Sequence, residues 1–524
     1  MFYKSYYLVL SLLSLILILP IIGLFTKFDF EIEYFIKFFQ SKYNIRIIYI
    51  SFIQAFLSSL FSCLLAIPFS LSLFRQKQSI INKLLISLSG YSFVLPPILV
   101  VYSVIGIYGL KGILNETFNF YQLLDIKSLF GLKGILIAHV LLNAPFATRI
   151  FYQNLNTIPK SYVEVSKSMN FGFWLNFFKL EWPIIKQNFF TVFLIIYILC
   201  FLSFAIVMAL GGGPRTSTLE VAIYQSVFFE LNFNKAIVLS AIQITICLSL
   251  MLVGFFTLRG TNYFDIQTED FIYPFSKRKL IVYIDSGIIA LFSIFLFSPI
   301  FYIFINFLKN LFNTNFYLNA HFIDAFTNSI ILCLITGFFV SFFGLVISII
   351  LVNCRNNFFY QQTLFILSSI ILIVSPVIIS LGYFIILGEL RYVNFVNFVV
   401  IIMINCIFLI PFAILILFTK LKNIYLNFND INEKSFFLII FPLIKKNIFF
   451  VFSFSAALSF GDFTIISFFK NGNFQTLPSL LYKLVISYRF TDATFVAGFI
   501  LIFSLFIYLL FDNNIYKDKP DKSI

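Results

Sequence analysis

Residue types that usually perform catalysis are scarce and scattered in this sequence. Its 524 residues include only two histidines, His139 and His321. The six cysteines lie singly, within or beside apolar runs, and form no CxxC pair: Cys63, Cys200, Cys247, Cys333, Cys354 and Cys406. This pattern indicates neither a disulfide framework nor a zinc site. We therefore expect no metal, no cofactor and no bond-making chemistry in this chain.

One carboxylate stands out because it interrupts an apolar run. Asp462 follows Ser459 and Gly461, and a carboxylate at membrane depth usually faces protein or water. It could pair with a cationic substrate, or it could serve helix packing or a gate near the outer surface. The small residues beside it favour packing. We therefore predict Asp462, Ser459 and Gly461 as possible pathway or gate residues.

A second feature, the glycine run Gly211–Gly213 before Pro214, could be mistaken for a phosphate-binding loop. It lacks the Lys-Ser/Thr pair that a P-loop needs. We expect a turn there, and no ATP site in this chain.

The elements that carry these residues must lie in lipid. The chain is 60% hydrophobic and 11% charged, with a mean hydropathy of +0.99, a ratio that water would not support. The formal net charge of +14 comes from Lys and Arg in short loops between apolar runs. It forms no basic stripe with interleaved aromatics, so we expect no nucleic-acid partner.

Apolar runs long enough to cross a bilayer predict about twelve transmembrane helices. They lie near residues 6–26, 47–73, 84–109, 132–156, 188–211, 235–257, 280–308, 325–352, 363–388, 394–419, 446–470 and 493–511. The first run lacks a small-residue cleavage site and is interpreted as a retained anchor. Basic clusters such as Lys277–Lys279 and the Lys-rich tail predict cytoplasmic N- and C-termini.

The chain repeats itself, which predicts two homologous six-helix halves, residues 1–265 and 266–524. Five segments recur in the same order: Leu88-Ser89…Pro97 and Leu367-Ser368…Pro376, Ala144–Ala147 and Ile410–Ala413, Trp182–Asn188 and Phe441–Asn447, Leu202–Phe204 and Leu458–Phe460, Thr218…Tyr224 and Thr476…Tyr482. An even number of spans makes the halves parallel repeats about an axis along the membrane normal. A substrate path then lies between them.

Two polar loops, residues 150–187 and 420–446, follow the fourth span of each half. The first carries Glu164, Asn170 six residues later, and Pro183. Asn tolerates a left-handed turn, so a short helix ending at Asn170 would make a rigid protruding corner. The second loop repeats the spacing, with Asn429 thirteen residues before Pro442.

This spacing resembles the "EAA" coupling loop of ABC importer permeases, which docks on the ATPase subunit. The likeness narrows to the fused thiamine-type permeases through three runs: Asn143–Arg149, Leu210–Gln225 and Leu458–Phe463 with the segment from Phe474 to Arg489. The second loop departs from the pattern, because Asn423 stands where the first has Glu164.

The resemblance implies an all-α importer permease in the bacterial cytoplasmic (inner) membrane, embedded in lipid. It implies two copies of a cytoplasmic ATP-binding subunit, which holds the ATP, and an extracytoplasmic thiamine-binding protein. The cargo would be thiamine or its phosphates.

Two alternatives stay open. The same machine could carry iron(III) or another small solute. An ion-coupled secondary transporter would also give parallel halves, but it would need several buried ion-binding groups and no coupling loop.

Overall fold

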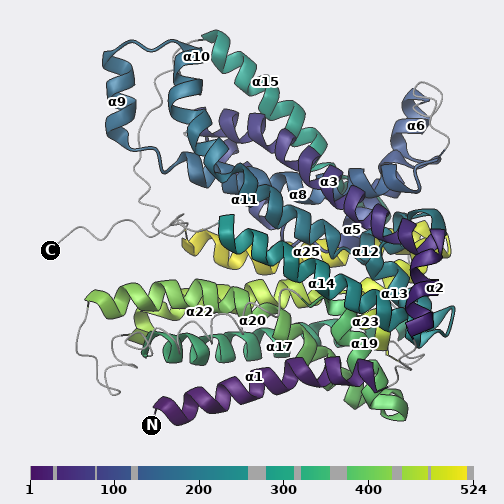
Figure 1. Ribbon diagram of the computed structural model, residues 1–524. Coiled ribbons are helices and arrows are strands. Elements are labelled where there is room, and N and C mark those ends of the chain that lie inside the picture. The colour runs from purple at the N-terminus through teal and green to yellow at the C-terminus, as the bar shows by residue number, and fades with distance from the viewer. Residues whose placement is uncertain are drawn as a thin grey trace. The chain divides into compact units, whose positions relative to one another are not determined.

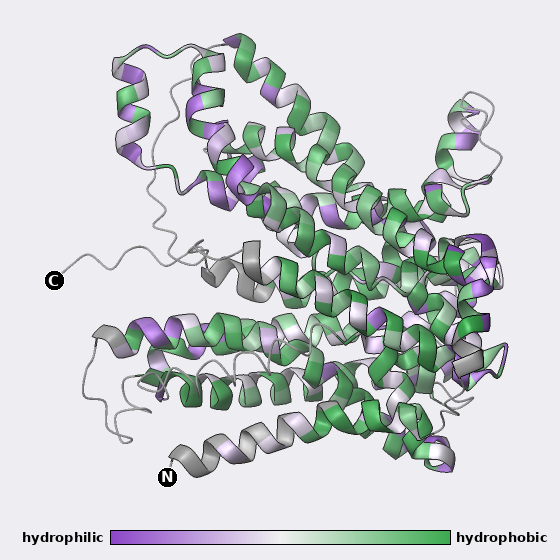
Figure 2. Cartoon of the chain, in the orientation of Figure 1, coloured by the Kyte–Doolittle hydropathy of each residue, from purple (hydrophilic) through white to green (hydrophobic). Residues whose placement is uncertain are grey.

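The computed structural model describes residues 2–26, 32–76, 79–119, 128–257, 279–311, 320–353, 374–427, 440–469 and 474–515. The elements in these ranges are helices (Figure 1). Ten of them are long and apolar enough to cross a membrane: Lys42–Arg75, Pro97–Phe118, Leu132–Leu155, Phe173–Phe201, Phe233–Gly254, Lys279–Leu296, Ala320–Asn353, Asn394–Tyr425, Phe441–Phe460 and Phe490–Leu509. Apolar residues dominate along them (Figure 2). The predicted all-α membrane fold is confirmed.

The two further spans of the predicted twelve are accounted for in part. The first, 6–26, coincides with α1 (Phe2–Phe25). The other, 363–388, ends in α19 (Pro376–Leu387), and its first residues lie outside the described ranges.

Four predicted single spans are broken, which corrects the sequence interpretation. Run 188–211 is divided into α11 (Trp182–Phe201) and α12 (Ala205–Leu210), and run 446–470 into α22 (Phe441–Phe460) and α23 (Thr464–Phe469). Run 84–109 is divided into α4 (Ile80–Tyr91) and α5 (Pro97–Tyr108), because the Pro96-Pro97 pair cannot continue a helix. Run 280–308 is divided into α15 (Lys279–Leu296) and α16 (Ser298–Asn310).

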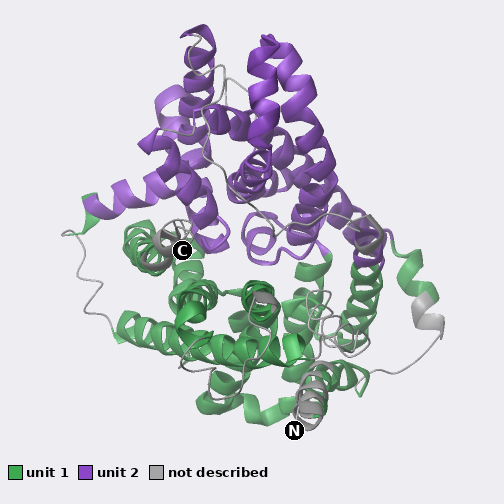
Figure 3. Cartoon of the chain, turned by 90° about the vertical axis from the view of Figure 1, so that its left-hand side faces the viewer, with its two compact units in different colours: residues 1–41, 219–248, 309–524 green, residues 42–218, 249–308 purple. Residues whose placement is uncertain are grey.

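The described chain falls into two compact units, coloured separately in Figure 3. Unit 2 comprises residues 42–218 and 249–308. In it, α3 (Lys42–Arg75) packs against α8 (Leu132–Leu155), α11 (Trp182–Phe201) and α15. Its other helices are α6 (Ile113–Phe118), α9 (Lys160–Ser168), α10 (Phe173–Asn176), η1 (Phe177–Glu181), α12 (Ala205–Leu210) and η2 (Pro214–Thr216).

Unit 1 comprises residues 1–41, 219–248 and 309–524. Its centre is α17 (Ala320–Asn353), which packs against α20 (Asn394–Asn427) and α22 (Phe441–Phe460). Its other helices are α1, α2 (Ile32–Gln40), α13 (Leu219–Phe228), α14 (Phe233–Thr257, shared with unit 2), α19, η6 (Gly388–Tyr392), α23 (Thr464–Phe469), α24 (Leu477–Ile486) and α25 (Phe490–Ile515).

Close helix packing in unit 1 depends on small residues. A Cβ on Gly344 of α17 would lie 2.5 Å from the Cβ of Ala413 on α20. Only glycine permits this approach, and small residues at helix contacts are the usual solution in a membrane, where burial from water does not drive association.

The two units differ in content from the two sequence halves. α1 belongs by sequence to the first half, yet it packs on α19 in unit 1, where the Tyr383 hydroxyl donates to the Ile16 carbonyl at 3.0 Å. α15 belongs by sequence to the second half, yet it packs on α3 and α8 in unit 2. Compactness and sequence repetition are different properties, so the halves 1–265 and 266–524 stay a prediction.

Candidate functional site

The loop between α8 and α11 forms a helix–turn–helix corner. α9 ends at Ser168, and Asn170 adopts a φ of +50°. The Phe171 N–H then donates to the Ser166 carbonyl at 3.0 Å, which closes the helix end. Asparagine is one of the few residues with a side chain that visits this left-handed conformation readily. The turn predicted at Asn170 is therefore present.

Several side chains of this corner are exposed. Glu164 and Asn170 are exposed, while Val163 of α9 is buried. Pro183 lies exposed in the first turn of α11. Large apolar side chains are exposed in the same segment: Tyr162, Val165, Met169, Trp174 and Phe178. An apolar patch among polar residues is typical of a protein-binding surface, and polar residues are frequent on α9 in Figure 2.

A buried ion pair fastens the far end of this loop to α3. Arg75, the last residue of α3, donates from Nε to Glu181 Oε1 at 2.9 Å and from a terminal nitrogen to Oε2 at 2.5 Å. The two side chains are 8% and 1% exposed. Such two-pronged Arg–carboxylate pairs are strong and fix orientation as well as distance.

The same arginine reaches two further elements of unit 2. Its guanidinium lies 3.5 Å from Asp285 Oδ1 on α15, and the Ser72 hydroxyl donates to that oxygen at 3.1 Å. It also stacks over the Phe173 ring of α10, 4.7 Å from the centroid. Arg75 thus joins α3, α15 and both ends of the α10–η1 segment.

The sequence analysis did not single out Arg75 or Asp285. Asp285 could have been noticed as a lone carboxylate inside an apolar run, which usually has a buried partner. Glu181 lies at the end of the polar loop, where its sequence neighbours do not mark it as a buried residue. Nothing in the sequence indicates that Arg75 meets Glu181, 106 positions later, or Asp285, 210 positions later.

The second loop is visible only at its ends. Asn423 is exposed near the end of α20, and Pro442 is exposed in the first turn of α22. Asn429 lies outside the described residues, so the turn expected there stays a prediction.

Asp462 lies in the turn between α22 and α23. Its Oδ1 accepts the backbone N–H groups of Thr464 at 2.9 Å and Ile465 at 3.4 Å, which caps the start of α23. Gly461 ends α22, and the Ser459 hydroxyl donates to Thr336 Oγ1 of α17 at 3.3 Å. These contacts are structural; a pathway or gate role for the three residues stays a prediction.

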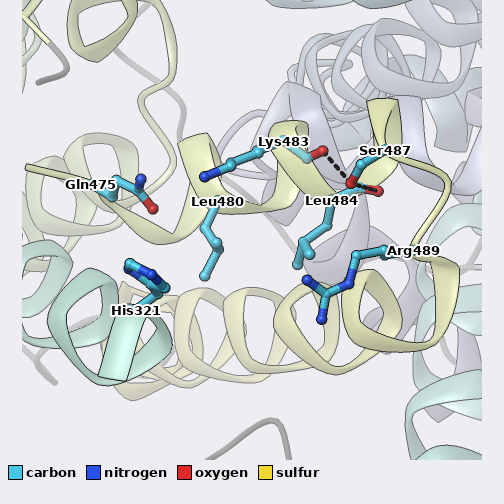
Figure 4. A pocket seen from close by; sticks show the side chains of 7 residues that line it. All are labelled: His321, Gln475, Leu480, Lys483, Leu484, Ser487 and Arg489. Atoms are coloured by element: carbon cyan, nitrogen blue, oxygen red, sulfur yellow. Dashed lines mark hydrogen bonds between the residues drawn. The ribbon is translucent and has the colours of Figure 1, made fainter. Parts of the chain in front are cut away.

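A small cavity of about 80 Å³ lies in unit 1, between the start of α17 and the end of α24 (Figure 4). Ligand sites in proteins typically measure about 300–1,000 Å³. Its lining carries three basic side chains and no carboxylate: His321, Gln475, Leu480, Lys483, Leu484, Ser487 and Arg489. Size and charge both make it unsuitable for an organic cation.

Comparison with known proteins gives a consistent set of relatives. The thiamine transport system permease protein ThiP of Haemophilus influenzae is 30% identical over 498 residues, covering 93% of this chain and 91% of that protein. The thiamine transport system permease protein ThiP of Escherichia coli is 26% identical, covering 93% and 91%. The ferric transport system permease protein FbpB of Actinobacillus pleuropneumoniae is 22% identical over only 56% of this chain and 44% of its own length. No protein-family model matches the chain.

Proposed function

The chain belongs to the thiamine transport system permeases, and on this premise we propose that it forms the membrane path of an ATP-driven importer for thiamine. The observation that supports the substrate most strongly is the similarity to thiamine permeases along nearly the whole chain. The ferric permease is more distant and matches about half the chain, so iron(III) is the weaker candidate. The chain is a multi-pass inner-membrane translocation subunit rather than an enzyme.

Its partners follow from this role. Two copies of a cytoplasmic ATP-binding subunit hydrolyse ATP, and a thiamine-binding protein delivers the cargo on the other side of the membrane. Both chain termini lie in the cytoplasm, on the side of the basic clusters. The permease itself is embedded in lipid.

The loop 150–187 transmits the ATPase movement. Glu164 and Asn170 form the corner that the ATPase subunit grips, and Pro183 starts α11 behind it. The loop 420–446, with Asn429 and Pro442, plays the same part for the second subunit. Because Arg75 fixes η1 to α3 and α15, a pull on the corner moves these helices as one body, and the substrate path changes its open side.

The test is labelled-thiamine uptake into lipid vesicles that hold the permease, its ATPase and its binding protein. Wild type should take up thiamine only with ATP. Glu164→Ala should weaken uptake while the complex still assembles, as shown by co-purification of the ATPase. Glu116→Ala, which removes an exposed carboxylate from α6, serves as the matched control and should behave as wild type.

Other outcomes separate the alternatives. An assembled complex that hydrolyses ATP but imports no thiamine would move the substrate to iron(III) or another solute. Uptake driven by an ion gradient without any ATPase would reject the importer mechanism.

A further inference from the structure

The helix α13 carries a carboxylate that has no exposed surface. Glu220 is 0% exposed. Its Oε1 accepts a hydrogen bond from the Gln243 amide of α14. Its Oε2 has no partner with hydrogen-bond geometry in the described part of the chain, although the Ser375 hydroxyl at the start of α19 lies near enough to stabilise the charged form. The Oε1 of Gln243 is also buried and lacks a donor. Two acceptor oxygens therefore lie together in unit 1 without enough donors.

These buried oxygens destabilise the folded protein unless a further hydrogen-bond donor or a cation lies beside them. A buried acceptor without a donor costs about 1–3 kcal/mol, and a buried unpaired charge costs more. Burial disfavours the charged form and raises the pKa of Glu220 to about 8. A cation placed beside Oε2 would favour the ionised form.

Aromatic rings continue the same face of α13. Tyr224 and Phe228 follow Glu220 at intervals of four residues, so the three side chains share one side of the helix. The Tyr224 ring lies 5.3 Å from that of Phe468 on α23, and the Phe228 ring lies 5.2 Å from that of Phe384 on α19. All of these residues belong to unit 1.

One ring of this aromatic cluster stacks against a positively charged side chain of the protein itself. The guanidinium of Arg391 in η6 stacks over the Phe384 ring, 4.2 Å from its centroid. Rings attract positive charge through their electron-rich faces, most strongly where water is excluded. The cluster thus offers flat rings at one end and an incomplete carboxylate–amide pair at the other.

We propose that Glu220, Gln243 and the rings of Tyr224, Phe384 and Phe468 form an internal station for an organic cation that carries an aromatic ring and an N–H donor. The rings stack on the ligand, Glu220 balances its charge, and the two acceptor oxygens receive its N–H groups. Thiamine, with an aminopyrimidine and a positively charged thiazolium, has this chemistry. This inference rests on the proposed function, and it identifies a site inside unit 1 at which thiamine binds during transport. Because Glu220 has no exposed surface, the ligand enters when α13 and α19 separate.

The experiment compares Glu220→Gln with wild type in the reconstituted complex, using labelled thiamine. Glutamine keeps the shape and removes the charge. Uptake per ATP hydrolysed should fall about tenfold or more, the effect of losing a charged hydrogen bond, while ATPase stimulation by the loaded binding protein persists. Glu230→Gln is the matched control: it removes a carboxylate that pairs with Lys235 two residues beyond α13, and it should transport as wild type.

Wild-type uptake by Glu220→Gln would overturn the proposal and make the carboxyl a neutral packing group. Wild type that hydrolyses ATP but imports no thiamine would instead refute the proposed function. A photoreactive thiamine analogue, mapped by mass spectrometry in the wild-type complex, gives a test that does not depend on a variant folding. Adducts on α13, α19 or α23 support the station, and adducts confined to other helices reject it.

Discussion

Replacing Arg75 with methionine should detach the loop between α8 and α11 from the helices behind it. The substitution keeps an unbranched apolar stem and removes the guanidinium. Glu181 and Asp285 are then left as neighbouring buried carboxylates without their cation. The stacking over Phe173 is lost as well.

The expected magnitude follows from burial. Both members of the Arg75–Glu181 pair are less than 10% exposed, so solvent does not screen the loss. Breaking such a pair by removing one partner typically costs about 3–5 kcal/mol. That shifts the ratio of docked to detached loop by a factor of about 100 to several thousand, at 1.4 kcal/mol per tenfold. In Arg75→Lys the ratio of docked to detached loop should lie between those of wild type and Arg75→Met. Lysine keeps the positive charge but loses the two-pronged geometry.

Limited trypsin digestion is a direct assay of detachment. Lys160 and Lys167 in α9 and Lys179 in η1 are cleavage sites within the loop. In Arg75→Met they should be cut faster than in wild type, and thiamine uptake per ATP should fall in the reconstituted complex. The control is Arg489→Met, which breaks the ion pair between Arg489 and Asp492. The Arg489 side chain is 56% exposed, and exposed pairs contribute only about 0–1 kcal/mol. The loop in this variant should therefore be digested at the wild-type rate.

The reasoning is refuted if Arg75→Met is digested at the wild-type rate and transports normally. The anchor would then be dispensable, and movement of the loop would reach the membrane helices through α11 alone.

Three further substitutions test separate features. Asn170→Gly should preserve transport, whereas Asn170→Val should lower it and speed loop digestion, because the left-handed conformation costs a residue other than Gly, Asn or Asp about 1–2 kcal/mol. Equal behaviour of the two variants would mean that the turn is not needed. Gly344→Leu should lower the thermal midpoint of the purified protein through its clash with Ala413, whereas Gly287→Leu, which meets open space, should not; equal midpoints would show that α17 does not need the close contact. Asp462→Asn should keep the cap on α23 and transport normally, whereas Asp462→Ala should lose about 1 kcal/mol; loss of uptake in Asp462→Asn would assign the charge itself to the pathway.

Local features of this protein were predictable from the sequence because their causes are local. Apolar runs define most spans, and the left-handed turn at Asn170 follows from its side chain and its distance to Pro183. The break at Pro97 also has a local cause, but the apolar run across it concealed the change of helix.

Features that depend on distant residues were not predictable. Arg75 meets Glu181 across 106 positions and Asp285 across 210, and neither hydropathy nor spacing encodes those encounters. Glu220 looked like an ordinary polar residue in a loop motif. Only the packing of α14 and α19 around it reveals a buried carboxylate with an incomplete set of partners.

The long sequence separation between Arg75 and Asp285 also determines how late in synthesis the contacts of Arg75 can form. Ribosomes add about 5–20 residues per second, so Glu181 emerges about 5–20 s after Arg75, and Asp285 about 10–40 s after it. Throughout that interval the newly inserted α3 ends in an arginine whose final neighbours have not been made. Because the last of them arrives on α15, after more than half of the chain is synthesised, a nascent chain halted before α15 cannot complete unit 2.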